Sequence, residues 1–178
     1  PGELEGELRE QHLLCAVPLV WPAELEALQA IAETFGPSCP RLTFFVAAAN
    51  DTVAREAEDS VRRLLPRAST VDLAARWPGM VRDSADALFN RGRRAVSGAN
   101  QKDLLLFAHL AEGELPEWVC RVETDSYFSP PNFRRFVLGR GLSGDDPLFL
   151  GSISYWHIHF EPRLVFNEQV QCLSRAAV

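Results

Sequence analysis

The 178-residue sequence contains no apolar run long enough to cross a membrane and no concentrated basic stripe. Its longest apolar run, Leu13 to Ala23, has 11 residues including two prolines, whereas a membrane-spanning helix needs about 20. No signal-peptide pattern stands at the N-terminus. The 18 basic residues are outnumbered by 24 acidic ones, and nucleic-acid binding requires clustered basic residues. The composition therefore argues against both a membrane span in this chain and a nucleic-acid partner.

Closely spaced cysteines are also missing. The four cysteines are scattered, whereas a structural zinc site is built from close pairs. The sequence leaves either buried thiols or one or two disulfides, and on its own it favours buried thiols. The four positions are Cys15, Cys39, Cys120 and Cys172.

The chain has enough apolar residues, 47% of the total, to bury one sizeable core. We read residues 1–11 as a loose polar lead-in and residues 12–178 as one domain. The first residue is Pro1 rather than Met, and Ser174 is read as the cap of a helix only four residues before the last residue. We therefore expect a trimmed or incomplete domain, which leaves open an N-terminal anchor in the full-length protein.

Strands and helices are predicted to alternate along the chain. This alternation predicts an α/β fold, with a mostly parallel sheet covered by helices on both faces. The helix after Ser129 is expected to bury Phe133, Phe136 and Val137 and to end at Gly139. The expected strands are His12–Val20, Arg41–Ala49, Ser69–Leu73, Trp118–Val122, Leu148–Ser154, Tyr155–Phe160 and Val165–Leu173, and the other expected helices cover 22–35, 52–65, 82–90 and 99–111.

Two carboxylates, Glu123 and Asp125, directly follow the predicted strand Trp118–Val122. Open α/β sheets bind ligands at the carboxyl ends of their strands. Carboxylates are the ligands that Mg²⁺ and Mn²⁺ prefer, with waters and phosphate oxygens completing the coordination. A cation between the two carboxylates would also turn their repulsion of a diphosphate into attraction. The alternative is that both residues are simply polar residues of a turn.

The stretch from Glu117 to Phe128 (EWVCRVETDSYF) resembles the metal-binding segment of glycosyltransferase family 31, which includes the core 1 β1,3-galactosyltransferases and the Fringe enzymes. Arg121 stands at the family's basic position. Glu123, Thr124 and Asp125 stand at the positions of its three aspartates. Weaker similarities in order and spacing extend from residue 12 to the end of the chain, at His12–Val20, Cys39, Lys102, Asn132–Phe136, Leu148–Gly151 and Leu173–Ala177.

The resemblance implies a Rossmann-like fold of the GT-A type and an inverting β1,3-glycosyltransferase. The implied donor is a UDP-sugar, UDP-galactose or UDP-N-acetylglucosamine, and the implied acceptor is a glycan or glycoprotein. Mn²⁺ or Mg²⁺ would be the cofactor, in a site formed by Glu123, Thr124 and Asp125. Of the two carboxylates that would hold the metal, Asp125 would bind it directly, with Glu123 nearer the ribose or a metal-bound water. The implied location is the Golgi or secretory lumen. There a Cys15–Cys39 disulfide is expected, whereas Cys120 and Cys172 are expected to stay unpaired.

Two departures from the family pattern stand against full activity. Thr124 replaces the middle acid, and no glycine-rich turn precedes Leu173. The family's catalytic base and its metal-binding histidine would lie beyond the last residue of this chain, so no residue here is assigned as the base. Asp145 and Asp146 are read as solvated loop residues. The alternative function is therefore a transferase-like binding module without catalysis.

Four further features of the sequence do not change this interpretation. An α/β phosphohydrolase needs an aspartate nucleophile where Glu123 stands. His157 and His159 alternate on a predicted strand and could bind a metal, but a half-buried strand face is favoured. Trp77 and Trp156 are assigned to core or turn packing. The sequon Asn50-Asp51-Thr52 supports a lumenal protein only weakly.

Overall fold

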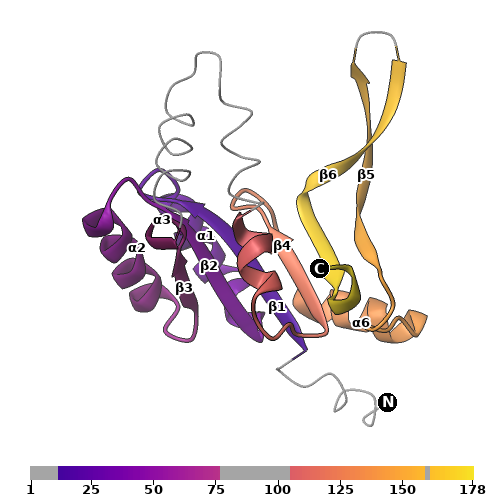
Figure 1. The fold of residues 1–178 in the computed structure, drawn as a ribbon, viewed down its shortest axis with the longest axis horizontal. Coiled ribbons are helices and arrows are strands. Elements are labelled where there is room, and N and C mark those ends of the chain that lie inside the picture. Colours follow the sequence, from indigo (N-terminus) through magenta and orange to yellow (C-terminus); the bar gives the residue numbers. More distant parts are fainter. Residues whose placement is uncertain (1–11, 77–104, 159–160) are drawn as a thin grey trace.

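The computed structural model describes residues 12–76, 105–158 and 161–178 of the chain (Figure 1). Six strands form one sheet in the order β3-β2-β1-β4-β6-β5. The lead-in 1–11, the Trp77–Gly79 turn, the helix predicted over 82–90, Lys102 and His159 lie outside the described residues. No helix in the described ranges is both long and apolar enough to cross a membrane.

The sheet is mixed but mostly parallel. Strands β1, β2, β3 and β4 run parallel, whereas β6 runs antiparallel to both β4 and β5. This confirms the predicted α/β fold with a mostly parallel sheet. The strand bounds are β1 Leu13–Val20, β2 Arg41–Ala47, β3 Ser69–Asp72, β4 Trp118–Val122, β5 Phe149–Ile158 and β6 Glu161–Ser174.

Helices cover both faces of the sheet, as predicted. Strand β1 is buried along its whole length, and its alternate side chains enter two separate cores because successive strand residues point to opposite faces. One core is covered by α1, α2 and α6, and the other by α3 and a helix over 105–111. The helices are α1 Leu25–Glu33, α2 Asp51–Leu64, α3 Leu73–Arg76 and α6 Pro130–Arg140, with 3-10 turns η1 Gly36–Ser38 and η2 Arg175–Ala177.

Several predicted boundaries and contacts are wrong. Helix α6 continues through Gly139 and ends at Gly141, whose φ of 61° is left-handed and suits glycine. Phe136 is 47% exposed instead of buried. The two strands expected over 148–160 are one strand, β5. The strand predicted over Val165–Leu173 is present but longer, as β6.

The cysteines form two disulfides, which corrects both the expectation of buried thiols and the expectation that Cys120 and Cys172 stay unpaired. The pairs are Cys15–Cys39 and Cys120–Cys172, with Cα–Cα distances of 6.2 and 4.0 Å. Cys120 is opposite Cys15 in the parallel β1–β4 pair and opposite Cys172 in the antiparallel β4–β6 pair. Strand register therefore brings these cysteines together, and the sequence alone does not reveal register.

The sequon residue Asn50 has a structural role. It is the N-cap of α2, and its side-chain Oδ1 accepts hydrogen bonds from the backbone N–H groups of Thr52 and Val53, both at 3.1 Å. Asparagine is among the preferred residues at this position because it satisfies unpaired helix donors. Capping thus explains Asn50 without glycosylation.

His109, in the helix over 105–111, should make folding stability depend on pH. Its ring packs against Phe45, with 5.6 Å between the ring centroids, and its Nδ1 lies 3.3 Å from the guanidinium of Arg76. Desolvation by burial, and then the positive charge of Arg76, lower the pKa of His109 from its usual 6.5. A proton therefore binds more readily to the unfolded chain, so this contribution to stability is full above about pH 6.5 and decreases on acidification.

We expect His109→Gln to lose less unfolding free energy than the wild type between pH 7 and pH 5. Urea unfolding at several pH values measures this difference. His12→Gln is the matched control, because His12 is a half-buried histidine that lies 2.9 Å from the carboxylate of Glu117. Equal pH dependence of the wild type and His109→Gln would contradict the assignment.

Candidate functional site

The carboxyl ends of β1 and β4 lie side by side at the point where the chain changes direction across the sheet. From β1 the chain proceeds to β2 and β3 on one side, whereas β6 and β5 lie beyond β4 on the other side. In open α/β sheets, ligands bind beside the carboxyl ends of the strands at such a switch point. Glu24 follows β1 and Glu123 follows β4, so both carboxylates belong to this region.

Glu123 is held by a buried arginine. Arg121, in β4, is only 3% exposed, and its guanidinium forms an ion pair with the carboxylate of Glu123, which is 26% exposed. Burying an unpaired guanidinium is costly, so this carboxylate stabilises the end of β4. Glu123 is therefore committed to a structural contact, and part of its side chain is exposed at the edge of the site.

Asp125 is exposed at the tip of the turn that follows β4. The backbone N–H of Ser126 donates to the carbonyl oxygen of Glu123 at 3.1 Å, which closes the turn. The Ser126 hydroxyl donates to Asp125 Oδ1 at 3.3 Å. Of the three residues predicted to bind the cofactor, Asp125 is thus the one whose carboxylate faces solvent.

Thr124 makes a contact that the sequence analysis missed. Its hydroxyl donates to Oε1 of Glu24 at 2.6 Å, and the other carboxylate oxygen of Glu24 accepts the backbone N–H of Val20. In the sequence, Glu24 is only an acidic residue near the start of the helix predicted over 22–35, where a negative charge suits the helix dipole. Its position in the turn after a buried strand was the available signal, because the same strand-end argument had identified Glu123.

The described residues offer a cation an incomplete protein site. Nowhere in the described ranges do three or more His, Cys, Asp or Glu side chains gather closely enough to hold a metal ion. Mg²⁺ and similar ions are often held by one or two carboxylates, with substrate phosphates and waters as the remaining ligands. Asp125 and Glu123 fit that pattern, in which a diphosphate supplies the ligands that the protein does not.

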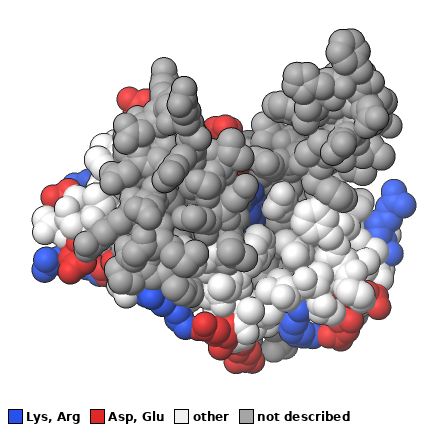
Figure 2. Space-filling view, turned by 45° about the horizontal axis from the view of Figure 1, so that its top comes forward, with Lys and Arg blue, Asp and Glu red and all other residues white. Residues whose placement is uncertain are grey.

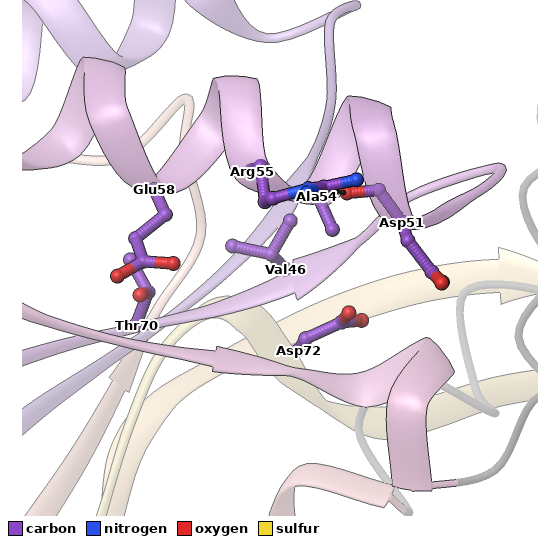
Figure 3. A pocket seen from close by; sticks show the side chains of 7 residues that line it. All are labelled: Val46, Asp51, Ala54, Arg55, Glu58, Thr70 and Asp72. Atoms are coloured by element: carbon purple, nitrogen blue, oxygen red, sulfur yellow. Dashed lines mark hydrogen bonds between the residues drawn. The ribbon is translucent and has the colours of Figure 1, made fainter.

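A pocket of about 500 Å³ lies at the open edge of the sheet between α2 and the carboxyl half of β3 (Figure 3). Figure 3 shows Glu58 and Thr70 pointing toward one another from the helix and the strand, with Asp72 directed into the space between the two elements. Carboxylates and a hydroxyl can accept hydrogen bonds from hydroxyl or N–H groups of a ligand. The lining residues are Val46, Asp51, Ala54, Arg55, Glu58, Thr70 and Asp72.

The other predicted site residues are distributed elsewhere. Asp145 and Asp146 are exposed in the loop before β5, where Asp145 pairs with Arg175, which confirms the reading of solvated loop residues. The backbones of Trp156 and His157 are part of β5. Figure 2 shows acidic and basic side chains intermixed along the lower rim of the molecule.

No model of a protein family matches this chain, and no curated protein matches it.

Proposed function

We propose that this chain binds a UDP-sugar together with Mn²⁺ or Mg²⁺ at the carboxyl edge of its sheet, as the donor-binding part of an inverting β1,3-glycosyltransferase with a GT-A type of fold. The observation that carries the proposal is the exposed carboxylate of Asp125, directly after β4 at the switch point of the sheet. The acceptor would be a glycan or glycoprotein.

The arrangement of the edge supports a nucleotide with a diphosphate. The pocket between α2 and β3 includes Asp51, which follows β2, and Asp72, which ends β3, so it reaches the carboxyl ends of the parallel strands, where Asp125 also lies. Its hydrogen-bond acceptors suit the hydroxyl and N–H groups of a nucleoside. Its carboxylates would repel phosphate, which would instead lie near Asp125 and a cation. When bound, the cation would act as a Lewis acid for the leaving diphosphate.

The test is calorimetric titration of UDP into the chain, with and without Mn²⁺. We expect binding that requires Mn²⁺, weak binding of Mn²⁺ alone, and at least a tenfold loss of UDP affinity in Asp125→Ala, since a metal ligand or charged contact contributes about 1.5–3 kcal/mol. Asp145→Ala is the matched control, because Asp145 is an exposed aspartate in the loop that touches Glu117, at the start of β4. Absence of Mn²⁺-dependent UDP binding in folded protein would refute the proposal.

A transferase-like binding module is the second candidate. Glu24 accepts the Thr124 hydroxyl and the Val20 N–H, and Glu123 pairs with Arg121, so neither carboxylate stands ready to remove a proton from an acceptor. Donor binding without transfer to any acceptor, measured on the full-length protein, would favour the module over the enzyme.

The two disulfides support a proposed location in an oxidising compartment such as the Golgi or secretory lumen. Disulfides persist in secreted and lumenal proteins and are rare in a reducing cytosol. Three of the four cysteines are buried, at 0–3% exposure.

A further inference from the structure

Glu24 joins two segments that are 100 residues apart in the sequence. It stands in the turn between β1 and α1, and its carboxylate has a separate partner for each oxygen. Oε1 accepts the hydroxyl of Thr124, and Oε2 accepts the backbone N–H of Val20 at the end of β1. The side chain therefore connects the carboxyl end of β1 to the turn that carries Asp125.

This connection spans the proposed ligand site. Strands β1 and β4 are neighbours in the sheet, paired from Leu13 and Trp118 at their amino ends to Ala16 and Arg121. Beyond Arg121 no further pairing with β1 is found, although β4 still pairs with β6 at Val122–Val170 and the turn is closed by the Ser126 N–H. On the side of β1, the turn is therefore held by side chains. Arg121, within β4, holds Glu123 by an ion pair, and Glu24, after β1, holds Thr124 by a hydrogen bond.

The chemistry of the pair explains why threonine is suitable at position 124. A carboxylate needs a donor, and the threonine hydroxyl supplies one. An aspartate at the same place would bring two negative charges within hydrogen-bond distance, and one of them would have to take up a proton. Glu24 and Thr124 thus form a complementary pair, and the threonine that departs from the three-aspartate pattern has a defined partner.

We propose that Glu24 is a positioning residue, which holds the turn 123–126 through Thr124 so that Asp125 faces the cation and the diphosphate. This inference rests on the proposed function for its ligand. A charge-assisted hydrogen bond is stronger than a neutral one and restricts the turn before the ligand arrives. Without it, binding must also order the turn, so affinity decreases.

The test compares four variants with the wild type by Mn²⁺-dependent UDP titration. Thr124→Val removes the hydroxyl at nearly constant shape, and Glu24→Ala removes the acceptor; each is expected to weaken binding about tenfold. Thr124→Ser keeps the donor and should bind as the wild type does. The double variant Glu24→Ala/Thr124→Val should bind no more weakly than Glu24→Ala alone, because Glu24→Ala already removes the contact with Thr124 as well as the one with Val20.

Glu26→Ala is the matched control for the helix-dipole explanation, because Glu26 is an exposed acid in the first turn of α1. If Glu24 acted only through the dipole, Glu26→Ala would weaken binding comparably and Thr124→Val would have no effect. The proposal would be overturned if the fold-loss of UDP affinity in the double variant equalled the product of the two single losses. Wild-type affinity in Thr124→Val would also overturn it.

Hydrogen exchange of the peptide 123–128 tests the same contact without any ligand. We expect exchange to be faster in Thr124→Val and Glu24→Ala than in Thr124→Ser, and in Thr124→Val this should occur at unchanged global stability. If the wild type binds no UDP but this difference is found, the proposed function fails and the positioning contact stands. If exchange is equal in all variants, the positioning contact itself is refuted.

Discussion

Removing the Cys120–Cys172 disulfide by alanine substitution of both residues is expected to lower the free energy of unfolding by about 4 kcal/mol. The two cysteines are 52 residues apart in sequence, and a cross-link stabilises a protein mainly by reducing the entropy of the unfolded chain, more for longer loops. For Cys15–Cys39, with a separation of 24 residues, the expected loss is about 3 kcal/mol. A small domain has only about 5–15 kcal/mol in total.

Denaturant unfolding of each double-alanine variant measures these losses. Alanine is the appropriate replacement because Cys15, Cys120 and Cys172 are buried, and serine would add an unsatisfied hydroxyl. Thiol titration of unfolded, unreduced protein is the independent check, and we expect it to find no thiol. Four reactive thiols would show that neither bond forms, and the argument for an oxidising compartment would then be lost.

Glu123→Ala is expected to destabilise the fold by about 2 kcal/mol, because the buried guanidinium of Arg121 loses this carboxylate partner. Replacing both residues, as Arg121→Met with Glu123→Gln, should restore part of the loss, since the buried charge is then absent. The exposed pair Glu58–Arg62 provides the matched control: Arg62→Ala should change stability by less than about 0.5 kcal/mol.

Thermal or denaturant unfolding of these variants also separates the two carboxylates of the site. If Glu123 serves the fold and Asp125 serves the ligand, Glu123→Ala lowers stability, whereas Asp125→Ala lowers only Mn²⁺-dependent binding. A Glu123→Ala variant as stable as the wild type would show that the ion pair with Arg121 contributes little, and Glu123 would then be a stronger candidate for a direct metal ligand.

The parts of the fold that the sequence predicts well are those with strong local signals. Strands β1, β2 and β4 are continuous apolar runs, and their predicted bounds agree with the structure to within two residues. The end of α6 was misplaced because both Gly139 and Gly141 are suitable stop signals, and only the left-handed backbone at Gly141 decides between them. Local sequence does not contain that information.

In the candidate site, too, the sequence predicts the residues with local signals but not the contacts between distant segments. The strand-end rule identified Glu123 and Asp125, because it needs only a predicted strand and the residues after it. The partners Arg121–Glu123 are also close in sequence. The Thr124–Glu24 contact joins residues 100 positions apart, and the pocket between α2 and β3 depends on how a helix lies against a strand. Both follow from strand order, which a single sequence does not determine.

The two disulfides cross-link two separate pairs of neighbouring segments in the sheet. Cys15–Cys39 fastens β1 to the residues just before β2, and Cys120–Cys172 fastens β4 to β6. No disulfide joins β1 to β4, since all four cysteines belong to these two disulfides. The β1–β4 boundary is therefore crossed by strand pairing and by the Thr124–Glu24 hydrogen bond, but by no covalent link. Under the proposed function, a nucleotide bound at the carboxyl ends of β1 and β4 would add contacts across this boundary and stabilise the pairing of the two strands.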